Sequence, residues 1–285
     1  MRLAILSDIH GSLPSLEAVL DDLQKYQPDH IIVAGDMVTG PNSVEVLTIL
    51  RDLDCCVIRG NNENYILRFE SGEAPDWWYT SKQFGFVRWT FKHMDKESLD
   101  FIHSLPERRA VEFDHQHAIC IVHGSPRSAD EHLYPGYDPE PLKVALSQTV
   151  EPVLICGHTH IPWTVKENNR LAFNPGAVCA SINGNPDAHY AMLTWQTNHW
   201  EVEHHSIPYD LNRLHRAYVE SGLLEEGSAF ARVFLLTVET GQNIAREFLP
   251  FAYEMATRAG YADCEFVPDD IWEEANRTFP WDRYR

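Results

Sequence analysis

The chain has 285 residues, of which 44% are hydrophobic and 23% charged, a composition typical of a soluble globular protein rather than a disordered, collagen-like or coiled-coil one. This length corresponds to one large domain or two small ones and is enough to bury a core without disulfides. The formal net charge of −19 opposes nucleic acid as a partner, because binding a phosphate backbone relies on Lys and Arg.

The sequence predicts neither a membrane anchor nor a disulfide framework. Apolar runs are all shorter than the roughly 18 residues of a transmembrane helix. The first run is also too short for a secretory signal peptide, and Asp8 interrupts it. The six cysteines form no CxxC pair, and most of them lie in apolar runs. This pattern favours reduced thiols and a cytoplasmic location.

Three short apolar runs near the start, at 2–7, 30–34 and 55–58, predict buried parallel strands. Between them, leucines and valines recur at helical spacing over 13–23 and 44–53. The resulting order of strands and helices favours an α/β fold with a parallel sheet. Each apolar run ends in a loop rich in Asp, Gly, Asn or His. Because ligands of such sheets bind outside the carboxyl ends of the strands, we expect a site where these loops meet.

The rest of the chain divides at Pro208. Residues 63–105 predict a helical, cap-like insertion. After it the pattern predicts, in chain order, a hairpin of strands at 111–113 and 117–122, a helix near 139–146, a strand at 153–156 and mainly strands from 161 to 207. We therefore assign residues 1–208 to one α/β domain and residues 209–285 to a helical C-terminal extension.

Side chains of metal-binding type follow the predicted strands. Two carboxylates, four imidazoles and one amide are enough for two divalent cations if one carboxylate bridges them. In Asp8-Ile9-His10, alternate residues leaving a strand point the same way, so both reach one ion. The oxygen content favours Mn²⁺, while Fe, Zn or Ni also fit, and the absence of cysteine disfavours a structural zinc site. The candidate ligands are Asp8, His10, Asp36, Asn61, His123, His158 and His160.

These residues stand in motifs that resemble those of the calcineurin-like metallophosphoesterases, whose pattern is DxH, GDxx, GNH[DE], Hx and GHxH. The motifs here are Asp8-Ile9-His10, Gly35-Asp36-Met37-Val38, Gly60-Asn61-Asn62-Glu63, His123-Gly124 and Gly157-His158-Thr159-His160. In addition, Asn174-Pro175-Gly176-Ala177-Val178 is similar to the Asn-Pro-Gly-Ser segment of the small bacterial and archaeal phosphodiesterase branch. The resemblance covers about residues 1–207. It implies a four-layer αββα sandwich, with two sheets packed together and helices outside.

The resemblance also implies a role for each ligand. One metal site would hold Asp8, His10, Asp36 and His160, and the other Asp36, Asn61, His123 and His158, so that Asp36 bridges the two. The substrate would be a small phosphate ester, attacked in line at phosphorus by a hydroxide that bridges the metals.

One position departs from the family pattern, because the catalytic histidine of GNH[DE] is replaced by Asn62. Asn62 cannot protonate a leaving group, but its amide can donate a hydrogen bond to a phosphate oxygen, which makes it the candidate catalytic residue. The small phosphodiesterase branch often lacks this histidine too. We therefore favour hydrolysis of a small, nucleotide-like phosphodiester over protein-phosphatase activity. His132 or His189 could supply a proton instead, although a surface or structural role is favoured for both.

Several features have two interpretations, and substrate-binding residues stay unassigned. Trp77-Trp78-Tyr79 either stacks on a nucleobase or, as we favour, packs the helical cap onto the core. Arg59 and Arg127 either contact phosphate or form surface ion pairs. The extension could pack on the body or mediate a homo-oligomer. For the whole chain, the alternative to an enzyme is a metal-binding interaction scaffold of the same fold with little or no catalysis.

Overall fold

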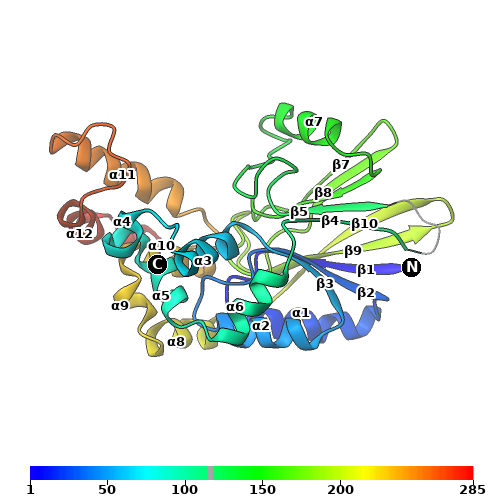
Figure 1. Cartoon of the computed structure of the whole chain (residues 1–285), viewed down its shortest axis with the longest axis horizontal. Helices are drawn as coiled ribbons and strands as arrows, with labels where there is room; N and C mark the ends of the chain where they lie inside the picture. The colour runs from blue at the N-terminus through cyan, green and yellow to red at the C-terminus, as the bar shows by residue number, and fades with distance from the viewer. Residues whose placement is uncertain (114–117, 285) are drawn as a thin grey trace.

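The computed structural model describes residues 1–113 and 118–284. Two five-stranded sheets lie face to face (Figure 1). The strands of the first sheet are β1 (Arg2–Leu6), β2 (His30–Ala34), β3 (Cys55–Ile58), β9 (Ala188–Gln196) and β10 (His199–Ile207), in the spatial order β10-β9-β1-β2-β3. Those of the second are β4 (Arg108–Val111), β5 (Ile119–Val122), β6 (Val153–Ile155), β7 (Trp163–Glu167) and β8 (Arg170–Asn174), in the order β4-β5-β6-β8-β7.

Both sheets are mixed. Strands β1, β2 and β3 pair in parallel, as the sequence predicts, while β9 and β10 extend that sheet in antiparallel fashion. Apolar side chains from both sheets fill the space between them; Ile5, Ile121 and Phe173, for example, are fully buried there. Burial on both faces explains why these strands read as nearly continuous apolar runs.

Helices cover the outer faces of the two sheets. The helices are α1 (Leu13–Tyr26), α2 (Ser43–Asp52), α3 (Asn61–Ser71), α4 (Asp76–Thr80), α5 (Gly85–Lys92), α6 (Lys96–Ser104), α7 (Glu140–Ser147), α8 (Leu211–Glu220), α9 (Leu223–Glu226), α10 (Ser228–Thr240), α11 (Ala245–Arg258) and α12 (Asp269–Thr278), with short 3₁₀ turns η1 (Lys82–Phe84) and η2 (Trp281–Tyr284). Helices α1 and α2 pack on the first sheet, and α7 packs on the second. The expected four-layer αββα arrangement is thereby confirmed.

The C-terminal helices gather at the end of the sheets opposite the N-terminus (Figure 1). They have a core of their own, in which Phe248 and Trp272 are fully buried. A second cluster joins them to the preceding domain, because Phe86 of α5 packs with Tyr218 of α8 and Leu235 of α10. The apolar face of the extension is thus covered within the chain. The domain division at residue 208 and a homo-oligomer stay predictions.

The hairpin differs from its predicted bounds. Strand β4 spans Arg108–Val111 rather than 111–113, because its register pairs Arg108 with Val122 and Val111 with Ile119. It is an exposed edge strand that carries two arginines, so a search for apolar runs misplaces it. Strand β5 begins at Ile119, and the predicted start at His117 lies outside the described residues. Residues 63–105 are largely helical, as predicted.

The cysteines and the lengths of the helices were also subjects of prediction. All six cysteines are free, as expected for reduced thiols. Among the described residues, no helix is long and apolar enough to cross a membrane.

Candidate metal centre

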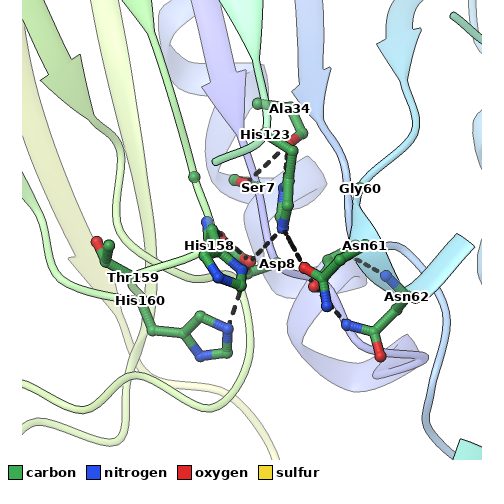
Figure 2. A network of polar contacts seen from close by, with 12 residues as sticks. Ser7, Asp8, Ala34, Gly60, Asn61, Asn62, His123, His158, Thr159 and His160 are labelled. Atoms are coloured by element: carbon green, nitrogen blue, oxygen red, sulfur yellow. Dashed lines mark hydrogen bonds and ion pairs between the residues drawn. The ribbon is translucent and has the colours of Figure 1, made fainter. Parts of the chain in front are cut away.

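The predicted ligands meet where the strands of both sheets end (Figure 2). The loops after β1 and β2 are joined by backbone hydrogen bonds: the Asp8 N–H donates to the Gly35 carbonyl at 3.0 Å, and the His10 N–H donates to the Asp36 carbonyl at 3.0 Å. From the second sheet, the His158 N–H donates to the Asp8 carboxylate at 3.0 Å. These bonds hold loops that are distant in sequence against one another.

Two glycines allow this close approach. A Cβ on Gly35, whose φ is +90°, would lie 2.7 Å from the backbone nitrogen of Gly60 and 2.8 Å from the ring of His123. A Cβ on Gly60 would lie 2.2 Å from the Asp36 carboxylate. Any larger residue at either position would displace a candidate ligand, since neither backbone nor ligand can move aside at no cost.

Six of the seven candidate ligands form two groups of three. One group contains Asp8, His10 and His160, and the other Asp36, His123 and His158; within each group the ligand atoms lie within 4.8 Å of one another. The seventh, Asn61, joins the second group, because its Oδ1 lies 3.1 Å from Nε2 of His123. Each group therefore presents oxygen and nitrogen donors to one point, which is the arrangement that a divalent cation requires.

Asp36 lies between the two groups. Its Oδ2 is 3.2 Å from Nε2 of His123 in one group and 3.8 Å from Nε2 of His10 in the other. Asp8 approaches both groups as well, with Oδ1 at 3.3 Å from Nε2 of His160 and 3.8 Å from Nε2 of His123. Both carboxylates are almost completely buried. Two buried negative charges so close together favour bound cations.

Three of the four histidines are oriented by a backbone carbonyl. His123 Nδ1 donates to Ala34 at 2.7 Å, and His160 Nδ1 donates to Ala180 at 2.7 Å. His158 Nε2 donates to the carbonyl of Asp130 at 3.2 Å. A donor nitrogen fixed in this way leaves the other ring nitrogen with its lone pair toward the cluster, which is the usual arrangement of metal-binding histidines. The residues present thus fit a metal pair.

The ligand positions carry backbone strain. Asp8, His10, Asp36, His158 and His160 all adopt positive φ, between 47° and 65°. This left-handed conformation costs a non-glycine residue about 1–2 kcal/mol. Its recurrence at five ligand positions indicates that the hydrogen bonds between the loops impose the conformation, and strain of this kind is typical of functional sites.

The four imidazoles differ in their affinity for protons. Burial and the neighbouring His160 lower the pKa of His10 to about 4. Burial and His123 likewise lower the pKa of His158 to about 3. Burial also opposes charge on His123, but Asp36 and Asp8 outweigh it and raise its pKa to about 10. At neutral pH, His10 and His158 are therefore unprotonated, as a ligand must be, and a cation beside His123 would displace a proton.

Glu63 is a positioning residue to which sequence reasoning assigned no role. Its buried carboxylate accepts four backbone N–H bonds, from Asp36 at 2.9 Å, Met37 at 2.8 Å, Val38 at 3.1 Å and Gly60 at 2.6 Å. It thereby fixes both the loop that carries Asp36 and the start of α3. An acidic residue at the third position of a helix that follows a strand was the signal that could have identified it.

Asn62 lies beside the bridging candidate. Its backbone N–H donates to Oδ1 of Asp36 at 2.9 Å, and its amide donates to Oδ2 of the same carboxylate. Its carbonyl accepts from the Thr39 hydroxyl at 2.8 Å. One amide hydrogen is thus used within the protein, and Asn62 is also among the residues that line the adjoining cavity.

A cavity of about 470 Å³ opens onto the cluster. Its walls include His10, Asp36, Asn61, His158 and His160 together with residues that the motifs did not indicate. Many of those additional residues come from η1 and α5 and from the C-terminal helices α10 and α11. The sequence patterns did not predict the part of the wall that α10 and α11 form, because it depends on how the extension crosses the strand ends.

The two alternative proton donors differ in their position relative to this cavity. His132 lines it, and its ring lies 4.3 Å from that of His158. His189 is absent from the described lining residues; it is buried elsewhere, with Nε2 at 3.5 Å from the Asn183 amide. His132 therefore lies beside the cluster, whereas His189 does not line its cavity; a role of either in proton transfer stays a prediction.

For Arg59 and Arg127, the structure shows ion pairs within the protein. Arg59 donates to the Leu105 carbonyl and pairs with Glu107, and Arg127 pairs with Glu131. Neither belongs to the described cavity lining.

The aromatic segment packs within the helical cap, as favoured, and one of its rings also lines the cavity. Trp78 is 6% exposed and stacks on Phe84 at 4.1 Å, which is the favoured packing role. Trp77, in contrast, lines the cavity, while its ring stacks on Phe266 of the extension at 5.0 Å. The segment thus supports the cap and also forms part of the cavity wall.

The comparisons with known proteins agree with this geometry. The family model of the calcineurin-like phosphoesterase superfamily domain matches residues 1–198. The phosphodiesterase YfcE of Escherichia coli K12 is 28% identical over 204 residues, which cover 68% of this chain and 87% of that protein. An uncharacterized protein of Methanocaldococcus jannaschii is 26% identical over 242 residues, which cover 78% of this chain and 94% of that protein.

A solved structure extends the likeness. The crystal structure of a metallophosphoesterase from Sphaerobacter thermophilus is 26% identical, with a TM-score of 0.68, and the match covers 85% of this chain and all of that one. Residues 1–208 alone are too few to account for a match over 85% of the 285 residues. Part of the helical extension therefore has a counterpart in that structure.

Proposed function

Because the chain belongs to the calcineurin-like phosphoesterase superfamily and is thereby a phosphoric ester hydrolase, we propose that it hydrolyses small phosphodiesters at a pair of divalent metal ions. The observation that carries this proposal is the pair of ligand groups with Asp36 between them. Two bound cations supply Lewis acidity and neutralise charge that develops on phosphorus oxygens. The proposed ligands are Asp8, His10, Asp36, Asn61, His123, His158 and His160, with Mn²⁺ favoured by their oxygen content.

A diester is favoured over a monoester because relatives of the chain are phosphodiesterases, among them YfcE of Escherichia coli. In addition, Asn62 replaces the histidine that would protonate a leaving group. A positioned general acid contributes about 10²–10⁴-fold, so a chain without one depends on a better leaving group. The Asn62 amide orients the Asp36 carboxylate and keeps one N–H for a phosphate oxygen. The phosphate of the substrate would then lie between the metal pair and the Asn62 amide.

The test is metal analysis coupled to turnover. The purified protein is stripped of metal and reloaded with Mn²⁺, Fe²⁺, Zn²⁺ or Ni²⁺, and bound metal is measured together with hydrolysis of bis(p-nitrophenyl) phosphate and p-nitrophenyl phosphate. We expect two ions per chain, faster cleavage of the diester and the highest rate with Mn²⁺. Absence of bound metal and of cleavage would overturn the proposal. Bound metal without cleavage of either ester would support an interaction scaffold instead.

A further inference from the structure

The cavity beside the cluster has a wall of a different character from its metal-facing side. Apolar side chains project into it from η1 and α5 on one side and from α10 on the other. They are Phe84, Phe86, Val87, Phe230, Val233 and Phe234. A volume of about 470 Å³ falls in the range of small-molecule sites, so the cavity has room for an organic group besides a phosphate.

This wall offers no charge to a ligand. None of the described residues that line the cavity is Lys or Arg. Two polar side chains on this side have partners within the protein. The Gln83 amide donates to the Tyr253 hydroxyl at 3.2 Å and accepts from the Val267 N–H at 2.9 Å. The Thr237 hydroxyl donates to the carbonyl of Val233 at 3.0 Å. An anionic group placed here would lose its water without gaining a Lys or Arg partner among the described lining residues.

The aromatic surface begins at the cluster itself. The Phe234 ring lies 4.9 Å from that of the candidate ligand His10, edge to face, and 5.2 Å from that of Phe86. A group bonded directly to a phosphate on the metal pair would therefore reach these rings without a spacer. Aromatic rings favour other rings in stacked or edge-to-face contact.

We propose that this cavity binds an uncharged aromatic ester group of the substrate, and that it selects against substrates with a further anionic group next to the phosphate. This proposal rests on the proposed function, because the metal pair is what holds the phosphate. It assigns the C-terminal helices a direct part in substrate binding through Phe234.

The first experiment measures binding without turnover. Calorimetry on the metal-loaded protein compares phenylphosphonate with methylphosphonate, which share one head group and differ in the ring. We expect phenylphosphonate to bind at least about tenfold more tightly, as burial of a ring in an apolar pocket provides. Equal affinities would overturn the proposal.

Variants then test whether the preference for the phenyl ring arises in the cavity. In Phe234→Ala we expect the ratio of the two affinities to fall several-fold toward one. Ala245→Phe fills part of the cavity and leaves less space for the phenyl ring, so it should also lower the ratio. It keeps the test valid if Phe234→Ala does not fold. Phe251→Ala is the matched control, because Phe251 is a half-buried ring of α11 that is not among the described lining residues, and the ratio should be unchanged. An equal loss for both ligands in Phe234→Ala and Ala245→Phe would contradict a role in recognising the ring.

The outcomes separate this proposal from the proposed function. Ester turnover without a phenyl preference would overturn the aromatic site and leave the phosphodiesterase proposal standing. A phenyl preference without turnover of any ester would do the reverse. If neither metal nor phosphonate binds, both proposals fail.

Discussion

The two sides of the cavity are built in different ways. On the metal-facing side, each ligand lies within a few residues of the end of a strand, and five of the ligands have positive φ in loops that hydrogen bonds join. On the apolar side, residues from η1–α5 and from α10–α11 meet although about 150 positions separate them in the chain. The chemistry of this protein is thus encoded in short local motifs, whereas the shape of its site depends on tertiary packing.

The largest effect is expected at the residue between the two ligand groups. Asp36→Asn removes the negative charge shared by both groups, so we expect loss of both metals and a fall in ester hydrolysis of about 10³-fold or more. Metal analysis and turnover on the same sample check this. Asp100→Asn, an exposed carboxylate of α6 paired with Lys96, is the control and should retain metal and activity. Full activity in Asp36→Asn would contradict the bridging assignment.

A core substitution in the extension tests whether the two regions unfold together. Trp272 is fully buried, and Trp272→Ala should cost about 3–5 kcal/mol. Because α5 shares a buried cluster with α8 and α10, we expect a single thermal transition at a lower temperature. A second, unshifted transition that retains bound metal would show that the extension is an independent unit.

The positioning role of Glu63 gives a smaller effect. Glu63→Gln replaces one acceptor oxygen by an NH₂ group that faces backbone N–H donors, so the loop that carries Asp36 loses support. We expect a loss of about 10–100-fold in metal affinity or activity, as is usual for groups that orient ligands. Glu70→Gln, on the exposed face of the same helix and paired with His103, should have little effect. Equal behaviour of the two variants would contradict the positioning role.

The smallest effect is expected at Asn62. Asn62→His places a titratable ring beside Asp36, but the side-chain contacts of this position, with Thr39 and Asp36, are those of an amide. We therefore expect metal content to be unchanged and the ratio of monoester to diester hydrolysis to shift by at most about tenfold, short of the 10²–10⁴-fold of a positioned acid. A larger gain with monoesters would show that the site is built for a histidine at this position.

The metal-facing side could be predicted from the sequence for a physical reason. Carboxyl ends of neighbouring parallel strands meet at one edge, so Asp8 and Asp36 are brought together by topology, and the glycines beside them mark close backbone approach. The helical character of residues 63–105 followed from their sequence pattern, whereas the four-layer arrangement was implied by the family resemblance.

The apolar side could not be predicted in this way. The apolar residues of α10 read as an ordinary core face, and indeed Val233 belongs to the helical core while also lining the cavity. Which part of such a face remains open to a ligand depends on how the helix crosses the strand ends. The position of β4 was wrong for a related reason, since an exposed edge strand is set by pairing with β5 rather than by its own hydrophobicity.

The most direct test of the central claim is a crystal structure of the Mn²⁺-loaded protein with anomalous diffraction measured at the manganese edge. We expect two anomalous peaks, one beside Asp8, His10 and His160 and one beside Asn61, His123 and His158, with the Asp36 carboxylate contacting both. A single peak, or two peaks of which only one contacts Asp36, would contradict the central claim.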